Sequence, residues 1–154
     1  MVDLKKSLWI IPIFSAIIAV IAILTPVAYV LYTGGGLYFW LWALNIRTDT
    51  GEIWFNTDTL ALVGAVLETF VIVLAILILI STVLKIRNKG INLRKVKILW
   101  LFCGILLIIA PIGYIIGGQF YATNFWNTYS PGFGVIGLFI AAALAIIEIF
   151  IYKD

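Results

Sequence analysis

The stretch TLALVGAVLETFVIVLAILILISTVL, residues 59–84, contains a single charged side chain, that of Glu68. An α-helix needs about 20 mainly apolar residues to cross the hydrocarbon core of a lipid bilayer. A run of this length and hydrophobicity predicts a transmembrane helix rather than a buried helix of a soluble domain. The bilayer is therefore expected to be the solvent that decides the fold.

The remainder of the chain has the same character. Of its 154 residues, 64% are hydrophobic and 11% are charged, whereas soluble domains are about 45–50% apolar and about 25% charged. Hydropathy predicts three further spans, at residues 9–32, 98–118 and 133–152. The connections are two outer loops and one inner loop, at residues 33–58, 119–132 and 85–97. We therefore expect one domain over residues 1–154, an all-α membrane protein built as a four-transmembrane-helix bundle.

The basic residues predict how the bundle is oriented. Nine of the ten lie at the termini or in the inner loop, and they are Lys5, Lys6, Lys85, Arg87, Lys89, Arg94, Lys95, Lys97 and Lys153. Only Arg47 lies in an outer loop. Cytoplasmic loops carry an excess of Lys and Arg, so we expect a multi-pass protein of the cell membrane with both termini in the cytoplasm. The lipid bilayer is an expected partner; nucleic acid is not, because its recognition needs a basic face on a folded domain.

The residues that are missing restrict the chemistry. The sequence has no histidine and one cysteine, Cys103. This excludes Ser-His pairs, His metal ligands and an intrachain disulfide. The Gly34-Gly35-Gly36 run is interpreted as a turn, because no phosphate-binding motif follows it. We expect no enzymatic activity, no cofactor and no metal.

The first outer loop predicts a small extracellular β-hairpin. Aromatic and β-branched residues flank an Asp49-Thr50-Gly51 turn, which is typical of paired strands. On a single strand over residues 37–46, the two-residue period would place Tyr38, Trp40 and Trp42 on one face. An isolated hairpin is marginal in water, so these aromatic side chains need to be covered. The candidate interaction residues of the two outer loops are Tyr38, Trp40, Trp42, Trp54, Phe55, Phe125, Trp126 and Tyr129.

Polar and small residues inside the predicted spans are the other candidates. Counted from Thr59, Glu68 is expected near the middle of the bilayer, where a charge is costly and marks a functional or partnered group. Three interpretations remain open: a proton or ion site, a contact to a partner subunit, or a protonated acid bonded to Thr25, Tyr114 or a backbone carbonyl. Glu148 is expected to reach the inner interface. Four glycines predict close helix packing: Gly113, Gly117, Gly134 and Gly137.

The order of spans and loops resembles the claudin and peripheral-myelin-protein superfamily of four-span proteins. The matching motifs are Gly36-Leu37, Thr50-Gly51, Trp54-Phe55, Phe120-Tyr121, Phe133-Gly134 and Leu138-Phe139. The resemblance implies a four-helix bundle with an outer β-hairpin. Two features depart from the family. The family's disulfide pair is missing, since the first outer loop has no cysteine, and the short stretch before the hairpin predicts fewer strands.

Three functional hypotheses follow. The first is a non-enzymatic membrane protein whose aromatic outer loops mediate lateral assembly, adhesion or membrane organisation. The second is an accessory or structural subunit of a larger membrane complex, such as a respiratory complex, a transport complex, or a viral or vesicle envelope. The third is an oligomeric channel that uses Glu68. Self-association or other membrane subunits are the expected protein partners.

Overall fold

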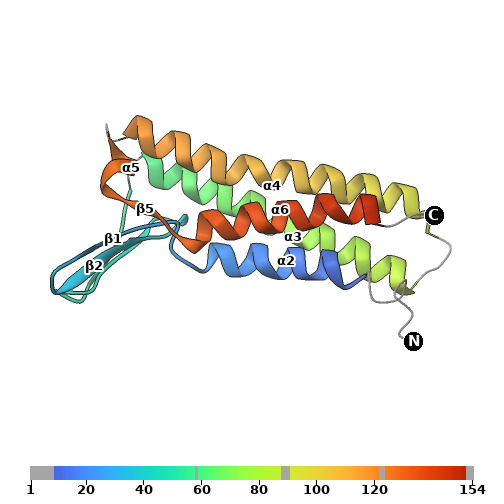
Figure 1. The fold of residues 1–154 in the computed structure, drawn as a ribbon, viewed down its shortest axis with the longest axis horizontal. Coiled ribbons are helices and arrows are strands. Elements are labelled where there is room, and N and C mark those ends of the chain that lie inside the picture. The colour runs from blue at the N-terminus through green and yellow to red at the C-terminus, as the bar shows by residue number, and fades with distance from the viewer. Residues whose placement is uncertain (1–8, 58, 88–90, 122–123, 152–154) are drawn as a thin grey trace.

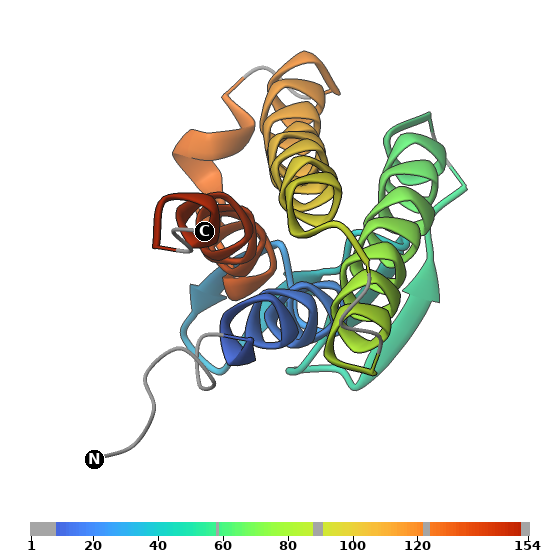
Figure 2. The same cartoon turned by 90° about the vertical axis from the view of Figure 1, so that its right-hand side faces the viewer.

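The computed structural model describes residues 9–57, 59–87, 91–121 and 124–151. Within them, four helices form a bundle and an antiparallel sheet extends from one end of it (Figure 1). The bundle helices are α2 (Ile10–Ile23), α3 (Thr59–Arg87), α4 (Leu93–Tyr121) and α6 (Phe133–Ile151). Seen end-on, they form a ring in which α2 contacts α3, α3 contacts α4, α4 contacts α6 and α6 contacts α2 (Figure 2). We call the sheet end the outer end and the opposite end the inner end.

Three of the described helices, α3, α4 and α6, are long and apolar enough to cross a membrane. This finding supports the prediction of a membrane protein. The fourth bundle helix, α2, has 14 described residues, a length of about 21 Å at 1.5 Å per residue, which is less than the hydrocarbon thickness of about 30 Å. The four predicted spans therefore correspond to three helices of spanning length and one shorter helix.

The first predicted span is wrong at its outer end. Helix α2 stops at Ile23, and Ala28–Tyr32 forms strand β1 instead of continuing the helix. Pro26 explains the change, because proline disfavours helical backbone at the residue before it and offers no N–H of its own. Residues 85–97 also differ from a simple inner loop, since α3 extends to Arg87 and α4 begins at Leu93.

The described sheet has five strands in the order β4-β3-β2-β1-β5. They are β1 (Ala28–Tyr32), β2 (Gly35–Phe39), β3 (Leu44–Arg47), β4 (Glu52–Phe55) and β5 (Ser130–Pro131). The β3–β4 hairpin matches the prediction, and Gly51 in its turn has a φ of 70°, a conformation that glycine adopts freely. The sheet has more strands than the predicted hairpin, partly because the segment assigned to the first span supplies β1.

The predicted single strand over residues 37–46 is also wrong. The chain reverses between β2 and β3: Trp40 N–H donates to Leu44 O at 2.8 Å, and Ala43 has a φ of 70°. Tyr38 lies in β2, whereas Trp40 and Trp42 belong to the connecting loop. These three side chains therefore do not form one face of a strand.

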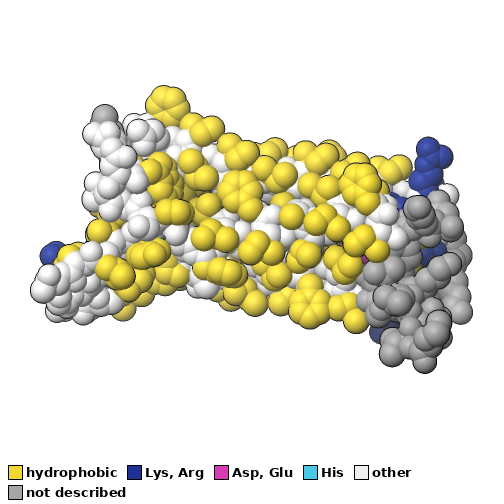
Figure 3. Space-filling view, viewed as in Figure 1, with side chains coloured by type: hydrophobic (Ala, Val, Ile, Leu, Met, Phe, Trp, Pro, Cys, Tyr) yellow, Lys and Arg dark blue, Asp and Glu magenta, His cyan; other side chains and the backbone are white. Residues whose placement is uncertain are grey.

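Small residues pack the centre of the bundle. Ala16, Ala19 and Ala22 of α2 are fully buried, as are Ala141 and Ala145 of α6. The Ser15 hydroxyl donates to Ala141 O at 2.7 Å, which fixes α2 against α6. The outward faces of the helices carry large hydrophobic side chains, and Figure 3 shows them along the length of the bundle. Such a surface is suited to lipid rather than water.

The sheet is attached to the bundle by close backbone contacts. A Cβ at Gly64 of α3 would lie 2.1 Å from Leu41 O, in the loop between β2 and β3. At the start of α6, Gly132 N–H donates to Val27 O at 2.8 Å and Gly134 N–H donates to Pro26 O at 2.9 Å. These contacts allow no side chain at Gly64 and fix the position of the outer sheet.

Candidate functional site

The far tip of the sheet is held by a polar cluster. The Tyr32 hydroxyl donates to Asp49 Oδ1 at 2.9 Å, and Arg47 Nε donates to the same oxygen at 3.0 Å. Burial alone would raise the pKa of the Asp49 carboxyl, but the Tyr32 hydrogen bond and the Arg47 charge hold it below its ordinary value. The hydrogen bond to Tyr32 and the charge of Asp49 raise the pKa of Arg47. The cluster ties β1, β3 and the β3–β4 turn together.

The second outer loop packs against its own chain. It contains the short helix α5 (Phe125–Thr128). The rings of Phe125 and Tyr129 lie 6.2 Å and 4.9 Å from the ring of Phe39 in β2. Trp126 Nε1 donates to Ile115 O at 2.8 Å, and its ring meets that of Tyr114 edge-on. The three candidate residues of this loop, Phe125, Trp126 and Tyr129, are thus used largely within the molecule.

The candidates of the β2–β3 region are half-buried. Tyr38 stacks on Tyr29 of β1 with ring centroids 6.2 Å apart, and Trp40 lies against Tyr38. Trp40 Nε1 also donates to Leu24 O at 3.0 Å, so it binds the end of α2. Trp42 contacts Phe55 of β4. Most of this aromatic surface joins the sheet to the bundle or one strand to the next.

Strand β4 is the exception, because all four of its residues are exposed. Ile53 is 65% exposed, Phe55 62% and Trp54 36%. The strand is at the edge of the sheet, paired with β3 on one side only. Asn56 N–H donates inward to Ala43 O at 2.9 Å. Because backbone groups alternate along an antiparallel strand, those of Ile53 and Phe55 point outward from the edge.

Glu68 lies in the outer half of α3. It is four residues after Gly64, which touches Leu41, so it lies about 6 Å below that loop at 1.5 Å per residue. Helix α3 extends to Arg87, so its centre is at Val73, five residues from Glu68; the expected depth of Glu68 in the bilayer stays a prediction. Glu68 is half-buried. Of the suggested partners, Thr25 donates its hydroxyl to Ala22 O at 2.9 Å, and the ring of Tyr114 packs against Trp126.

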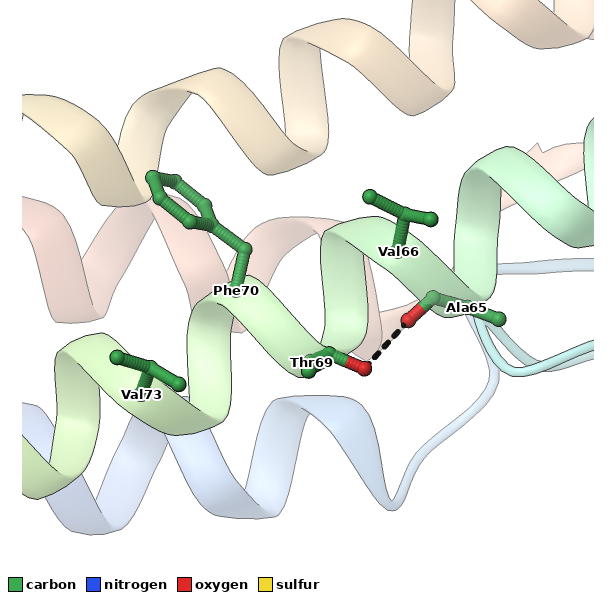
Figure 4. A pocket seen from close by; sticks show the side chains of 5 residues that line it. All are labelled: Ala65, Val66, Thr69, Phe70 and Val73. Atoms are coloured by element: carbon green, nitrogen blue, oxygen red, sulfur yellow. Dashed lines mark hydrogen bonds between the residues drawn. The ribbon is translucent and has the colours of Figure 1, made fainter.

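A shallow groove of ≈ 400 Å³ follows the outward face of α3. Its lining residues are Ala65, Val66, Thr69, Phe70 and Val73. Figure 4 shows these side chains along the helix, with the Thr69 hydroxyl donating to Ala65 O at 2.9 Å. The groove is almost entirely apolar. Its chemistry suits an acyl chain or the side chains of another helix.

The four candidate packing glycines differ in their surroundings. Gly137 is buried where a Cβ would approach Ala22 of α2 to 2.9 Å. Gly134 faces Val27, and a Cβ there would approach the Val27 side chain to 2.6 Å. Gly113 has more room, with Leu67 of α3 at 3.4 Å, and Gly117 is half-buried.

At the inner end, one tryptophan fills the centre of the bundle. Trp100 of α4 is fully buried and donates from Nε1 to Ser81 Oγ of α3 at 3.1 Å. Its ring meets that of Trp9, which precedes α2, edge-on at 5.9 Å. Two sides of the ring of helices are thus joined through Trp100. We call Trp9, Ser81 and Trp100 the inner cluster.

Glu148 lies near the inner end of α6. The sequence predicts that it reaches the inner interface, but it is 0% exposed. Both carboxyl oxygens are buried without a hydrogen-bond partner in the described part of the chain. A signal was present in the sequence: Ala141, Ala145 and Glu148 follow the spacing of one helix face, so a buried Ala face extends to Glu148.

No protein-family model matches the sequence, and no curated protein is significantly similar to it. Among the residues that the structure describes, no group of three or more His, Cys, Asp or Glu side chains could hold a metal ion. The functional argument therefore depends on the geometry of the two ends of the molecule.

Proposed function

We propose that this chain is a non-enzymatic membrane protein whose outer sheet assembles laterally with a second copy of itself through the edge of β4. The observation that carries the proposal is the exposure of the whole strand at an open sheet edge. An apolar edge of this kind is a template for pairing with another strand. The other outer aromatic candidates are largely occupied by intramolecular contacts.

Strand β4 is complementary to itself in an antiparallel arrangement. When Ile53 faces Phe55 of the second copy, their outward N–H and C=O groups pair in both directions. Trp54 then lies opposite Trp54 of the second copy across a two-fold axis, and such aromatic cross-strand pairs are stabilising. Glu52 would face Asn56 of the second copy, so no like charges oppose each other.

The positions of the charges support an orientation for this assembly. Lys85, Arg87 and Lys95 lie at the inner end, where Figure 3 shows basic side chains, and Arg47 lies on the sheet. We infer from the excess of basic residues at the inner end that both termini are cytoplasmic and that the sheet is outside the cell membrane. The relationship to the claudin and peripheral-myelin-protein superfamily is likewise a proposal, supported by the order of helices and outer strands.

Substitution of Ile53 tests the proposal. Proline at this position removes the outward N–H of β4 and leaves the β3–β4 ladder intact. The matched control, Ile53→Thr, retains the N–H and the β-branched shape. In nanodiscs or mild detergent, we expect wild type and Ile53→Thr to form dimers or larger homomers, and Ile53→Pro to be monomeric. Equal assembly of all three proteins would exclude pairing through the β4 edge.

The groove on α3 favours a second candidate function, that of an accessory subunit in a larger membrane complex. A helix of another subunit would lie along Ala65, Thr69 and Val73, close to Glu68. Mass measurement of the complex purified from its native membrane separates the two functions. A homomer agrees with the β4 proposal, whereas a fixed stoichiometry with other chains would replace it.

A further inference from the structure

We propose that Glu148 is a proton-binding site at the inner end of the bundle, occupied in the closed structure and emptied only when the inner cluster opens. The proposal is independent of assembly through β4, because the two sites lie at opposite ends of the molecule (Figure 1). It is based on a carboxyl group that is completely buried and unbonded within the described residues.

The packing of α4 against α6 locates Glu148 beside Trp100. A Cβ at Gly104 of α4 would contact Ala142 O, Ala145 and Ile146 of α6. Since α4 and α6 run in opposite directions (Figure 1), Trp100 lies at the level of Glu148, one helical turn further toward the inner end. The carboxyl group therefore lies at the level where Trp100 fills the centre.

The contact between α2 and α6 gives an independent estimate of the level of Glu148 along the bundle. Ser15 donates to Ala141 O, and Glu148 lies seven residues beyond Ala141 toward the inner end. On the other helix, seven residues back from Ser15 lead to within one residue of Trp9, which directly precedes α2. Glu148 is thus buried at the level of the contact between Trp9 and Trp100, where α2 and α4 begin.

The surroundings favour the neutral acid. An ionised carboxylate that is buried without a hydrogen bond or a counter-charge is strongly destabilised. The described part of α2 that faces Glu148 carries no titratable group. On α4, Lys97 and Cys103 each lie three residues from Trp100; Lys97 is half-buried and the Cys103 thiol is fully buried. On α3, Lys85 donates from Nζ to Ile91 O.

Loss of the proton from Glu148 requires a change of conformation. The O–H bond of the acid breaks, the carboxylate retains the electron pair, and the proton passes to a water molecule at the inner end. The resulting carboxylate needs water or a cation around it. Because Glu148 is buried at the level of the contact between Trp9 and Trp100, solvation requires this contact to separate. The cluster is therefore a two-state element that a proton holds closed.

Infrared difference spectroscopy of the full chain in nanodiscs tests whether the proton is present. We expect Glu148→Gln to lose a protonated-acid carbonyl band at neutral pH and to retain all carboxylate bands. Glu68→Gln, which changes a half-buried carboxyl, serves as the matched control. Loss of a carboxylate band in Glu148→Gln would overturn the proposal, since it would show an ionised and paired group. Glu148→Met is a second, apolar variant. A site that is neutral tolerates this replacement, whereas a buried ion pair does not.

Cys103 provides a native reporter of opening. It is fully buried on α4, one turn from Trp100, and is the only cysteine of the chain. The rate of its reaction with N-ethylmaleimide is compared between wild type and Glu148→Gln at each pH, so that thiol ionisation cancels in the ratio. We expect a ratio near unity in acid that rises at least tenfold at alkaline pH. A ratio that stays constant over the whole range would contradict a proton-held closure.

Discussion

The two ends of the bundle differ in which side chains they expose and which they bury. At the outer end, Asp49 is exposed and accepts hydrogen bonds from Tyr32 and Arg47, whereas apolar β4 residues face outward. At the inner end, Trp100 is enclosed, and Glu148 is buried without a described partner. The outer end therefore has an unpaired, exposed strand edge at its surface, whereas the inner end has an unbonded carboxyl group in its interior. We relate the first to assembly and the second to a proton-dependent closure.

Removal of the central side chain at the inner end should have the largest effect. Trp100→Ala leaves a cavity where a fully buried side chain was, and Trp-to-Ala changes in a packed core cost about 3–5 kcal/mol. Ile53→Ala at the outer edge is the control, because this side chain is 65% exposed and its loss should change stability by about 0.5 kcal/mol or less in the monomer. Unfolding in mixed micelles measures both. Equal losses would show that the inner cluster is not the more tightly packed of the two ends.

Separation of the outer sheet from the bundle should have the next largest effect. Gly64→Ala would place a methyl group 2.1 Å from Leu41 O, a backbone atom that cannot rotate away. Overpacking of this kind costs about 1–3 kcal/mol. At Gly113 the nearest atom is a flexible Leu67 side chain at 3.4 Å, so Gly113→Ala is the control. Protection of β2 and β3 amides from hydrogen exchange should fall in Gly64→Ala only, and unchanged protection there would place the attachment elsewhere.

An effect of similar size is expected from loss of the hydrogen bond that positions Trp100. Ser81→Ala leaves the indole N–H buried without its acceptor, which costs about 1–3 kcal/mol. Ser81→Cys keeps a weak acceptor of similar size and should lose less. Tryptophan fluorescence should shift in Ser81→Ala because the ring loses its bond. If the two variants match wild type in stability, packing rather than this bond positions Trp100.

The smallest expected effect is the loosening of the outer tip when acid protonates Asp49. The folded-state pKa of Asp49 is depressed. Its contribution to folding stability is therefore complete above the ordinary carboxyl pKa of about 3.9. It is lost as the pH falls through the lower folded value. Resonances of the β3–β4 turn should broaden in that acidic range in wild type and show no such transition in Asp49→Asn. A transition that persists in the variant would assign it to another carboxyl group.

The sequence could predict the membrane helices and the β3–β4 turn for clear physical reasons. Runs of apolar residues as long as 59–84 have few alternatives to a long helix, and Gly51 supplies the positive φ that the turn uses. The end of the first helix was harder to predict. Ala28–Tyr32 is apolar enough to extend a span, but Pro26 and pairing with β2 make it a strand.

The candidate sites could be predicted only as a set of residues. Phe125 and Tyr129 were identified by composition, but their packing on Phe39 depends on a contact between distant segments. Exposure of β4 depends on its place at the sheet edge, which periodicity does not reveal. The burial of Glu148 follows from the neighbouring helices, since its position near the chain end indicated the interface instead.

The most direct test of the central claim is a disulfide between two copies of β4. With Cys103→Ala as background, Trp54→Cys places one cysteine per chain in the non-hydrogen-bonded pair at the proposed two-fold axis, where the Cα atoms lie about 4.5 Å apart and a disulfide forms without strain. Ile53→Cys, one residue away, is the control and is off the axis. The account predicts rapid oxidation to a dimer for Trp54→Cys and little for Ile53→Cys. Equal cross-linking at the two positions, or none at Trp54→Cys, would contradict assembly through the β4 edge.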